Sequence, residues 1–229
     1  SDLRRLRLGI AGGEWKKMMA DATARTRFAS EVKKIIEQYD FDGVDFDFEW
    51  PANASEYNNY SATVIQMRST LGKYVYFTAS LHPVSFKISP EAIDALDFIS
   101  YQCYGPAVMR FPYEQFVKDG EAAVAYGIPK NKLVMGVPFY GSTGSLIAAY
   151  CDFVNDGLAT TNEDTYTYKG NTYTFNSIET IRKKARYVCE EDYAGIMSWD
   201  LATDIDITNN KSLLKVIKEE FEYYANPTE

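Results

Sequence analysis

The chain has 229 residues, of which 46% are hydrophobic and 24% charged, and its formal net charge is −8. These values are ordinary for a globular protein and exclude a disordered or collagen-like chain. The acidic balance, without a tract rich in lysine and arginine, argues against a nucleic-acid partner. No apolar run approaches the ~20 residues of a membrane span, and the first residues do not resemble a signal peptide.

Cysteine and histidine are too scarce to support most metal or nucleophile chemistry. The chain has three cysteines and one histidine, His82, and no CxxC pair. A disulfide framework and a zinc site are therefore not expected, and a histidine-based triad would depend on that single residue. We expect no metal and no cofactor. Chemistry should instead rest on carboxylates and on the 18 tyrosines.

Short apolar, β-rich runs alternate along the chain with segments of helical periodicity. The predicted strands are Leu6–Ala11, Val44–Phe48, Val75–Ser80, Phe98–Cys103, Leu133–Pro138 and Gly195–Trp199. The predicted helices are Ala22–Tyr39, Glu56–Leu71, Tyr113–Tyr126, Ile178–Cys189 and Lys211–Tyr224. This alternation is typical of a parallel sheet covered by helices, either a doubly wound sheet or a (β/α)8 barrel. The doubly wound alternative normally brings a glycine-rich phosphate loop, and Gly12-Gly13 is too short for one.

One segment departs from the alternation. Two threonine- and tyrosine-rich runs, Thr165–Tyr168 and Thr172–Phe175, flank Lys169-Gly170-Asn171. This pattern predicts a β-hairpin near residues 161–178. We interpret it as a small excursion within a single domain that covers residues 1–229.

The most informative segment is Phe41–Pro51, where apolar and acidic residues alternate from Val44 to Trp50. On a strand, successive side chains point to opposite faces. The apolar set is Val44, Phe46 and Phe48, and the acidic set is Asp45, Asp47 and Glu49. The carboxylates would form a row with about 6–7 Å between neighbours. Such a row is costly to bury, and no basic residue in the segment accompanies it.

Three interpretations of the row are open at this point. It could be the solvated face of an edge strand, although the phenylalanines opposite and the position among parallel strands argue against that. It could bind a divalent cation, since carboxylates suit Mg²⁺. It could also serve acid catalysis, because closely spaced like charges raise the proton affinity of one member. Glu49 comes last, at the carboxyl end of the strand, where barrel active sites lie.

The segment DGVDFDFEWP, residues 42–51, resembles the DGxDxDxE signature of family 18 glycoside hydrolases, the chitinase family. Three further segments are similar to family motifs in order and spacing. They are Ile10–Gly13 for the SxGG segment, Leu133–Gly141 for the GxPxYG strand, and Gly195–Asp200 for the last strand with its tryptophan. The resemblance covers essentially the whole chain.

The resemblance implies a retaining, substrate-assisted mechanism, in which the N-acetyl group of the substrate is the nucleophile. Glu49 would be the general acid and then the base for water. Asp47 would orient the acetamide and stabilise the oxazolinium intermediate, and Asp45 would lie deeper and share a proton or hydrogen bond with Asp47. Tyr104 would hydrogen-bond the acetamide carbonyl. Asp42 starts the motif but precedes the strand, so we expect a structural role for it.

Four residues are the candidate substrate-binding set: Gln102, Trp199, Tyr140 and Trp50. Trp199 matches the tryptophan that forms the floor of the sugar site in the family, with ordinary core packing as its alternative. Gln102 stands where the commoner motif has methionine, and this Gln-x-Tyr version resembles the plant-type chitinases. Gly105 stands where the motif has aspartate. Gln102 could instead satisfy backbone groups of the barrel core. Tyr140 and Trp50 could be packing residues.

The leading function is hydrolysis of β-1,4-linked N-acetylglucosamine polymers, chitin or chitooligosaccharides, without a cofactor. The first alternative is an endo-β-N-acetylglucosaminidase acting on N-glycans. The second is a catalytically silent, chitinase-like sugar-binding lectin, although such relatives typically lose an acidic residue that this chain retains. The expected partner is a polysaccharide or oligosaccharide containing N-acetylglucosamine. The resemblance also implies a secreted or cell-envelope location.

The number of strands raises a question about the barrel. By motif, the six predicted strands resemble the third to eighth strands of the family, and its first two β/α units have no counterpart before them. We therefore expect six β/α units of a (β/α)8 TIM-barrel type, forming an incomplete or open barrel. We also expect weak or no activity from this polypeptide alone.

Overall fold

The computed structural model describes residues 4–226. The chain divides into two compact units. The first comprises Ser1–Tyr101 with Ala123–Lys132, and the second comprises Gln102–Ala122 with Leu133–Glu229. The two units are described separately.

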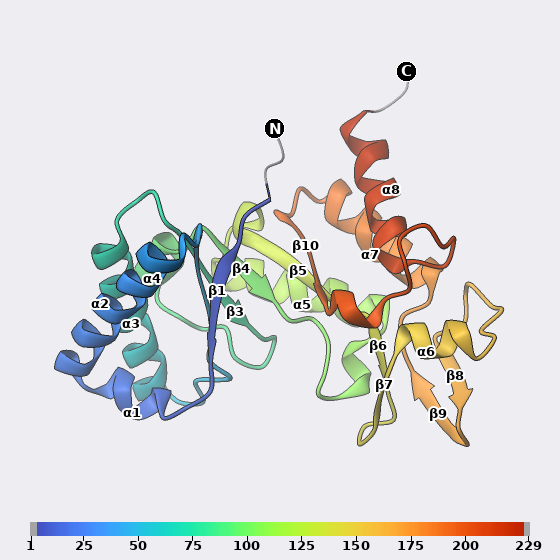
Figure 1. Ribbon diagram of the computed structural model, residues 1–229, viewed down its shortest axis with the longest axis horizontal. Helices are drawn as coiled ribbons and strands as arrows, with labels where there is room; N and C mark the ends of the chain where they lie inside the picture. Colours follow the sequence, from blue (N-terminus) through green and yellow to red (C-terminus); the bar gives the residue numbers. More distant parts are fainter. Residues whose placement is uncertain (1–3, 227–229) are drawn as a thin grey trace. The chain divides into compact units, whose positions relative to one another are not determined.

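The first unit is built on four parallel strands in the order β1-β2-β3-β4. They are β1 (Arg7–Ala11), β2 (Gly43–Asp47), β3 (Tyr76–Leu81) and β4 (Phe98–Tyr101). Helices follow three of these strands within the unit: α1 (Trp15–Ala20) and α2 (Ala22–Tyr39) follow β1, α3 (Ala54–Leu71) follows β2, and α4 (Pro90–Ala95) follows β3. Figure 1 shows α2 and α3 side by side next to these strands. Chain order and parallel pairing together identify successive β/α units.

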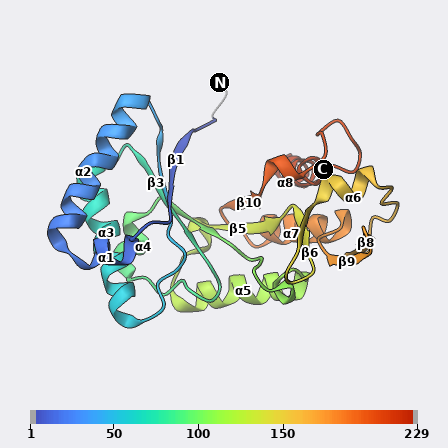
Figure 2. The same ribbon diagram turned by 60° about the horizontal axis from the view of Figure 1, so that its bottom comes forward.

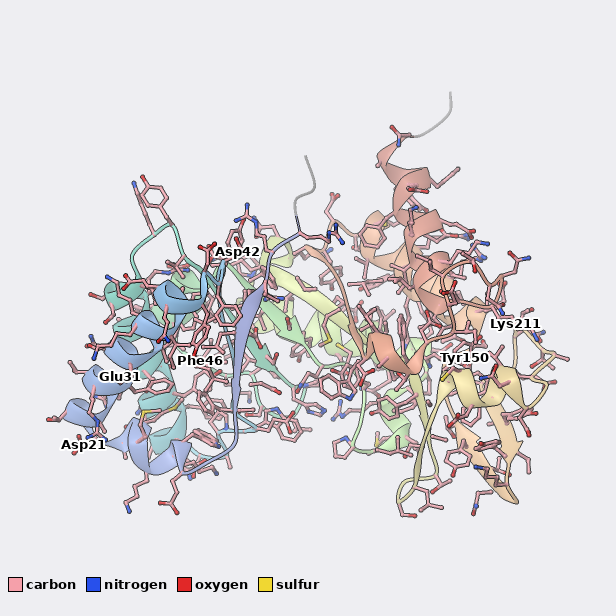
Figure 3. The ribbon with its side chains drawn as sticks, viewed as in Figure 1. Asp21, Glu31, Asp42, Phe46, Tyr150 and Lys211 are labelled. Atoms are coloured by element: carbon pink, nitrogen blue, oxygen red, sulfur yellow. The ribbon has the colours of Figure 1, made fainter. Side chains whose placement is uncertain are left out.

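Strand β2 supplies the centre of the first unit's core. Phe46 is fully buried, and its ring lies 5.8 Å from that of Phe28 on α2 and 4.8 Å from that of Phe77 on β3. Val44 and Phe48 are also buried, so the apolar face of the motif packs under the helices as expected. Figure 3 labels Phe46 in this position.

Polar side chains define where the helices of the first unit begin. Asp21, labelled at the start of α2 in Figure 3, accepts a hydrogen bond of 2.7 Å from the backbone N–H of Ala24. Asn53 caps α3, and Ser89 caps α4 ahead of Pro90. Each cap satisfies an N–H group that the helix itself leaves without a partner.

The second unit contains the parallel pair β5 (Leu133–Pro138) and β10 (Gly195–Trp199). Helix α5 (Tyr113–Tyr126) precedes β5, and its last residues, from Ala123, belong to the first unit. Helices α7 (Ile178–Glu190) and α8 (Leu213–Ala225) contact each other, as Figures 1 and 2 show. Helix α7 precedes β10, and α8 follows it, which continues the β/α order.

A four-stranded antiparallel sheet completes the second unit, in the order β7-β6-β9-β8. Its strands are β6 (Tyr140–Ser142), β7 (Ile147–Ala149), β8 (Thr165–Tyr168) and β9 (Asn171–Thr174). Helix α6 (Tyr150–Asn155) packs against it through Phe153, whose ring lies 5.5 Å from that of Tyr173. The hydroxyl of Tyr150 donates to the carbonyl of Lys211, and Figure 3 labels both residues.

The architecture agrees with the predicted alternation and adds elements to it. Residues 4–226 form six parallel strands, four in the first unit and two in the second. The predicted hairpin is present as β8 and β9, but it is half of a larger sheet, because β6 and β7 were not predicted. The short helices α1, α4 and α6 were also missed. That residues 1–229 form a single domain remains a prediction.

Candidate active site

The acidic residues of the motif lie on one face of β2, and their exposure increases along the chain. Asp45 and Asp47 are half-buried, and Glu49 is exposed. Glu49 follows the last residue of the strand by two positions, at its carboxyl end. In parallel β/α folds this is the end at which active sites form. The arrangement places the most accessible carboxyl group where a ligand can reach it.

Asp45 is held by donors from two neighbouring strands. The hydroxyl of Thr78 on β3 donates to Oδ1 of Asp45, and the hydroxyl of Ser80 donates to Oδ2 over 2.9 Å. From β1, the guanidinium of Arg7 lies 3.7 Å from Oδ1. Both carboxylate oxygens therefore accept hydrogen bonds, which fixes the orientation of the side chain.

Asp42 lies at the opposite end of β2 and has a structural role. Its Oδ2 accepts a hydrogen bond of 2.7 Å from the backbone N–H of Leu6, and its own N–H donates to the carbonyl of Leu6 over 2.8 Å. These bonds join the starts of β1 and β2, as expected for a residue outside the acidic row. Figure 3 shows the labelled Asp42 near the start of β1.

Trp50 follows Glu49 directly and packs against His82, with 4.6 Å between the ring centroids. His82 is buried, and its Nδ1 accepts a hydrogen bond of 3.2 Å from the backbone N–H of Val84. Behind the motif, burial and the charges of Asp45 and Asp47 raise the pKa of Tyr60. The Tyr60 hydroxyl therefore stays protonated.

The second unit contains the tyrosines of the candidate site. Tyr104 is buried, its hydroxyl donates to the sulfur of Met197 on β10 over 3.5 Å, and its ring lies edge-on to that of Tyr140 at 6.3 Å. Burial raises the pKa of Tyr140 to about 12, so this hydroxyl is a donor at neutral pH. The ring of Phe111 supports Tyr140 at 5.5 Å.

Gln102 and Gly105 lie on either side of Tyr104. Gln102 is buried. Gly105 has a φ of +35°, and a Cβ atom there would lie 2.7 Å from the hydroxyl of Tyr140. Both the backbone conformation and the lack of space favour glycine, so the aspartate of the commoner motif does not fit here without a shift of Tyr140.

Trp199 ends β10 and is 55% exposed, which is unusual for so large an apolar side chain. It is in register with Pro138 at the end of β5, and its carbonyl accepts a hydrogen bond of 2.8 Å from the N–H of Phe139. The next residue, Asp200, caps the short 3₁₀ turn Leu201–Thr203. The indole is therefore held at the carboxyl end of the strand and exposed to solvent.

The described part of the chain has neither a cluster of metal ligands nor a membrane-spanning helix. Within residues 4–226, no group of three or more histidine, cysteine, aspartate or glutamate residues is arranged to hold a metal ion. None of the described helices is both long enough and apolar enough to cross a membrane.

Three residues that contact the acidic row were not among the predicted candidates: Arg7, Thr78 and Ser80. Each occupies a polar position that alternates with apolar residues on a strand, as in Phe77-Thr78-Ala79-Ser80. Polar side chains on strands adjacent to an acidic strand are the signal that would have found them. The register that brings Thr78 opposite Asp45 came only from the tertiary structure.

A parallel β/α fold with an acidic row that runs to the carboxyl end of one strand is the arrangement in which enzymes of the TIM-barrel type hold their active sites. The sequence model of the family described as "Glycosyl hydrolases family 18" matches residues 5–204. The chain therefore belongs to family 18 of the glycosyl hydrolases.

Known relatives agree with this assignment. The chain is 23% identical over 297 residues to "Probable chitinase 2" of Drosophila melanogaster, which covers 95% of this chain and 60% of that protein. A chitinase structure from Bacteroides thetaiotaomicron superposes with a TM-score of 0.80 at 24% identity, covering 94% of this chain and 76% of that one. The chitinase ChiB of Flavobacterium johnsoniae gives 0.78 at 26% identity, covering 94% and 74%.

Proposed function

We propose that the chain hydrolyses β-1,4-linked N-acetylglucosamine polymers or oligomers by a retaining, substrate-assisted mechanism. The observation that carries the proposal is the acidic row on β2, whose three members are all present and whose exposure increases from Asp45 to Glu49. Membership of family 18 and the chitinase names of its relatives support this substrate class.

In the first unit, Glu49 would protonate the glycosidic oxygen and then remove a proton from the attacking water. Asp47 would orient the acetamide and stabilise the positive charge that develops when the N-acetyl oxygen attacks the anomeric carbon. Asp45, with both oxygens accepting hydrogen bonds, would hold Asp47 in place. Trp50 would contact the sugar beside Glu49.

In the second unit, Tyr104 would donate a hydrogen bond to the acetamide carbonyl oxygen. Trp199 would stack its exposed indole on the apolar face of a sugar ring, and Tyr140 would donate its protonated hydroxyl. Gln102 would contribute an amide to the same sugar-binding set. A methionine–aspartate pair in place of Gln102 and Gly105 would make different contacts, so these two positions are proposed to influence substrate preference.

The six parallel strands are proposed to correspond to the third to eighth strands of the family barrel, because the motif strands occur in that order. The location outside the cell or in its envelope also remains a proposal. It is supported only by the polymeric substrate that the family resemblance implies.

A pair of substrates and one variant test the proposed function. The protein is incubated with a fluorogenic chitobioside and with a high-mannose glycoprotein, and release of product is measured. We expect turnover of the chitobioside, weak for this polypeptide alone, and Glu49→Gln should lower kcat by about 10²- to 10⁴-fold while oligosaccharide binding persists. Glu31→Gln, on the exposed face of α2, is the matched control and should leave kcat unchanged.

Each remaining outcome has a definite meaning. Cleavage of the glycoprotein alone would replace the chitin substrate with N-glycans. Binding of chitooligosaccharide without hydrolysis of either substrate, by a folded protein, would establish a lectin and refute the enzyme. An unchanged rate in Glu49→Gln would refute the assignment of the general acid.

A further inference from the structure

We infer that Arg7 is a positioning residue for the acidic row, acting on Asp45 through the hydroxyl of Thr78. The contacts themselves are independent of the reaction, whereas their effect on turnover rests on the proposed function. Arg7 touches no reacting atom in this proposal. It fixes the direction of the hydrogen bond from the Thr78 hydroxyl to Asp45, next to the residues that touch the reacting atoms.

The three residues lie on three adjacent strands. Arg7 is on β1 in register with Gly43, two residues before Asp45 on β2, and Asp45 is in register with Thr78 on β3. Nη1 of Arg7 donates to Oγ1 of Thr78 over 2.5 Å and lies 3.7 Å from Oδ1 of Asp45. The guanidinium also lies 4.8 Å from the ring centroid of Phe98, on β4.

The Thr78 hydroxyl has one hydrogen and two acceptors within reach. These are Oδ1 of Asp45 and, at 3.5 Å, the carbonyl of Val44. Because Arg7 donates to Oγ1, it occupies a lone pair of that oxygen and fixes the rotation of the hydroxyl. Its positive charge also draws the carboxylate of Asp45 to the same side. The hydrogen of Thr78 is therefore directed at Asp45.

Ser80 completes the arrangement by donating to the second oxygen of Asp45. Both carboxylate oxygens of Asp45 therefore accept a hydrogen bond, which holds this side chain in one orientation on the face of β2 that it shares with Asp47. Arg7 thus contributes to the fixed geometry of the acidic row through Thr78 and Asp45.

Partial burial strengthens these contacts. The side chain of Arg7 is 30% exposed and that of Asp45 is 18% exposed. Charge-assisted hydrogen bonds at such positions are screened less than those of fully exposed pairs. Arg5, two residues earlier, provides a contrast. It is exposed, and its guanidinium lies 3.9 Å over the ring centroid of Tyr76.

Steady-state kinetics on a chitooligosaccharide test the positioning role. We expect Arg7→Met to lower kcat about 10- to 100-fold with KM nearly unchanged, because misplacement of the acidic row affects the transition state more than substrate binding. Arg7→Lys should recover part of kcat, since it retains the charge without the planar fork. Arg5→Met is the matched control and should behave as wild type. An Arg7→Met enzyme with wild-type kcat would overturn the role in turnover.

A double-mutant cycle tests the contact without any need for turnover. The free energies of unfolding of Arg7→Met, Thr78→Val and the combined variant are compared with that of the wild type. We expect non-additive effects, because the two residues share one hydrogen bond. Additive effects would refute the contact. An inactive wild-type chain with a coupled cycle would instead refute the proposed hydrolysis and leave the contact standing.

Discussion

Acidic residues on the same face of one strand acquire different roles because different side chains surround them. Asp45 and Asp47 are both aspartates on the same face of β2, and the hydroxyls of Thr78 and Ser80 hold Asp45 in place. Glu49, past the end of the strand, is exposed. Alternation along the strand predicted the row. The hydrogen bonds of its individual members depend on the side chains that adjacent strands bring close to them.

Gly105 gives a prediction at the scale of a single residue. Gly105→Ala should lower the melting temperature, because a Cβ atom would lie 2.7 Å from the Tyr140 hydroxyl and the φ of +35° strains any other residue. Removing that hydroxyl with Tyr140→Phe in the same chain should recover part of the loss. Thermal denaturation of the two variants and of Tyr140→Phe alone checks this. Equal losses with and without the hydroxyl would contradict the steric explanation.

At the scale of elements, the long helices and the six parallel strands were predicted, whereas the shortest helices and strands were not. The bounds of α2, α5, β5 and β10 agree with prediction residue for residue. Helices of 6 residues, such as α4, are too short for a helical period to be recognised. Strands of 3 residues, such as β6 and β7, carry too little alternation. They form because β6 pairs with both β7 and β9 in the antiparallel sheet.

The apolar face of β2 packs in the core, whereas its acidic face carries the candidate catalytic residues. Replacing Phe46 tests how much the apolar face contributes to stability. Phe46→Ala should lower the free energy of unfolding by about 3–5 kcal/mol, because it leaves a cavity among buried aromatic rings. Urea denaturation measures the loss. Ile65→Ala, at an exposed position of α3, is the control and should cost far less. A loss for Phe46→Ala as small as the control's would mean that its ring is not a core residue.

At the scale of the whole molecule, the second unit buries a lysine without an ion pair. Lys184 on α7 is fully buried, and its ammonium donates to the carbonyl of Phe111 over 2.7 Å and to Oδ1 of Asn176 over 2.6 Å. Among the described residues, no carboxylate forms an ion pair with it. Burial lowers the pKa of Lys184 to about 7. The same carbonyl belongs to the residue whose ring supports Tyr140.

This lysine predicts a pH dependence of global stability. Above about pH 7 the folded protein releases the Lys184 proton, whereas the unfolded chain keeps it up to the ordinary lysine range. The unfolded state then binds more protons, so the Lys184 contribution to the free energy of unfolding rises with pH, by up to about 1.4 kcal/mol per pH unit. The destabilisation caused by the buried Lys184 ammonium is fully present below pH 7 and decreases as the pH rises above 7.

Denaturation at several pH values between 7 and 9 checks this dependence. The difference in free energy of unfolding between the wild type and Lys184→Met should grow in favour of the wild type as the pH rises. Taking this difference cancels the titration of groups that do not interact with Lys184. Burial raises the pKa of the neighbouring Cys103 thiol well above its ordinary value. Lys183→Met, at an exposed position, should show no such trend. A pH-independent difference for Lys184→Met would mean that the buried amine does not titrate in this window.

The amino-acid sequence determined the features that depend on local order: the β/α alternation, the two faces of β2, the acidic row and the membership of family 18. Only the tertiary structure decided which side chains meet. Arg7, Thr78 and Asp45 are distant in the chain, as are Gly105 and Tyr140, and their contacts follow from strand register and packing. The physical reason is that periodicity specifies which face a residue occupies, whereas partners across a sheet are set by long-range pairing.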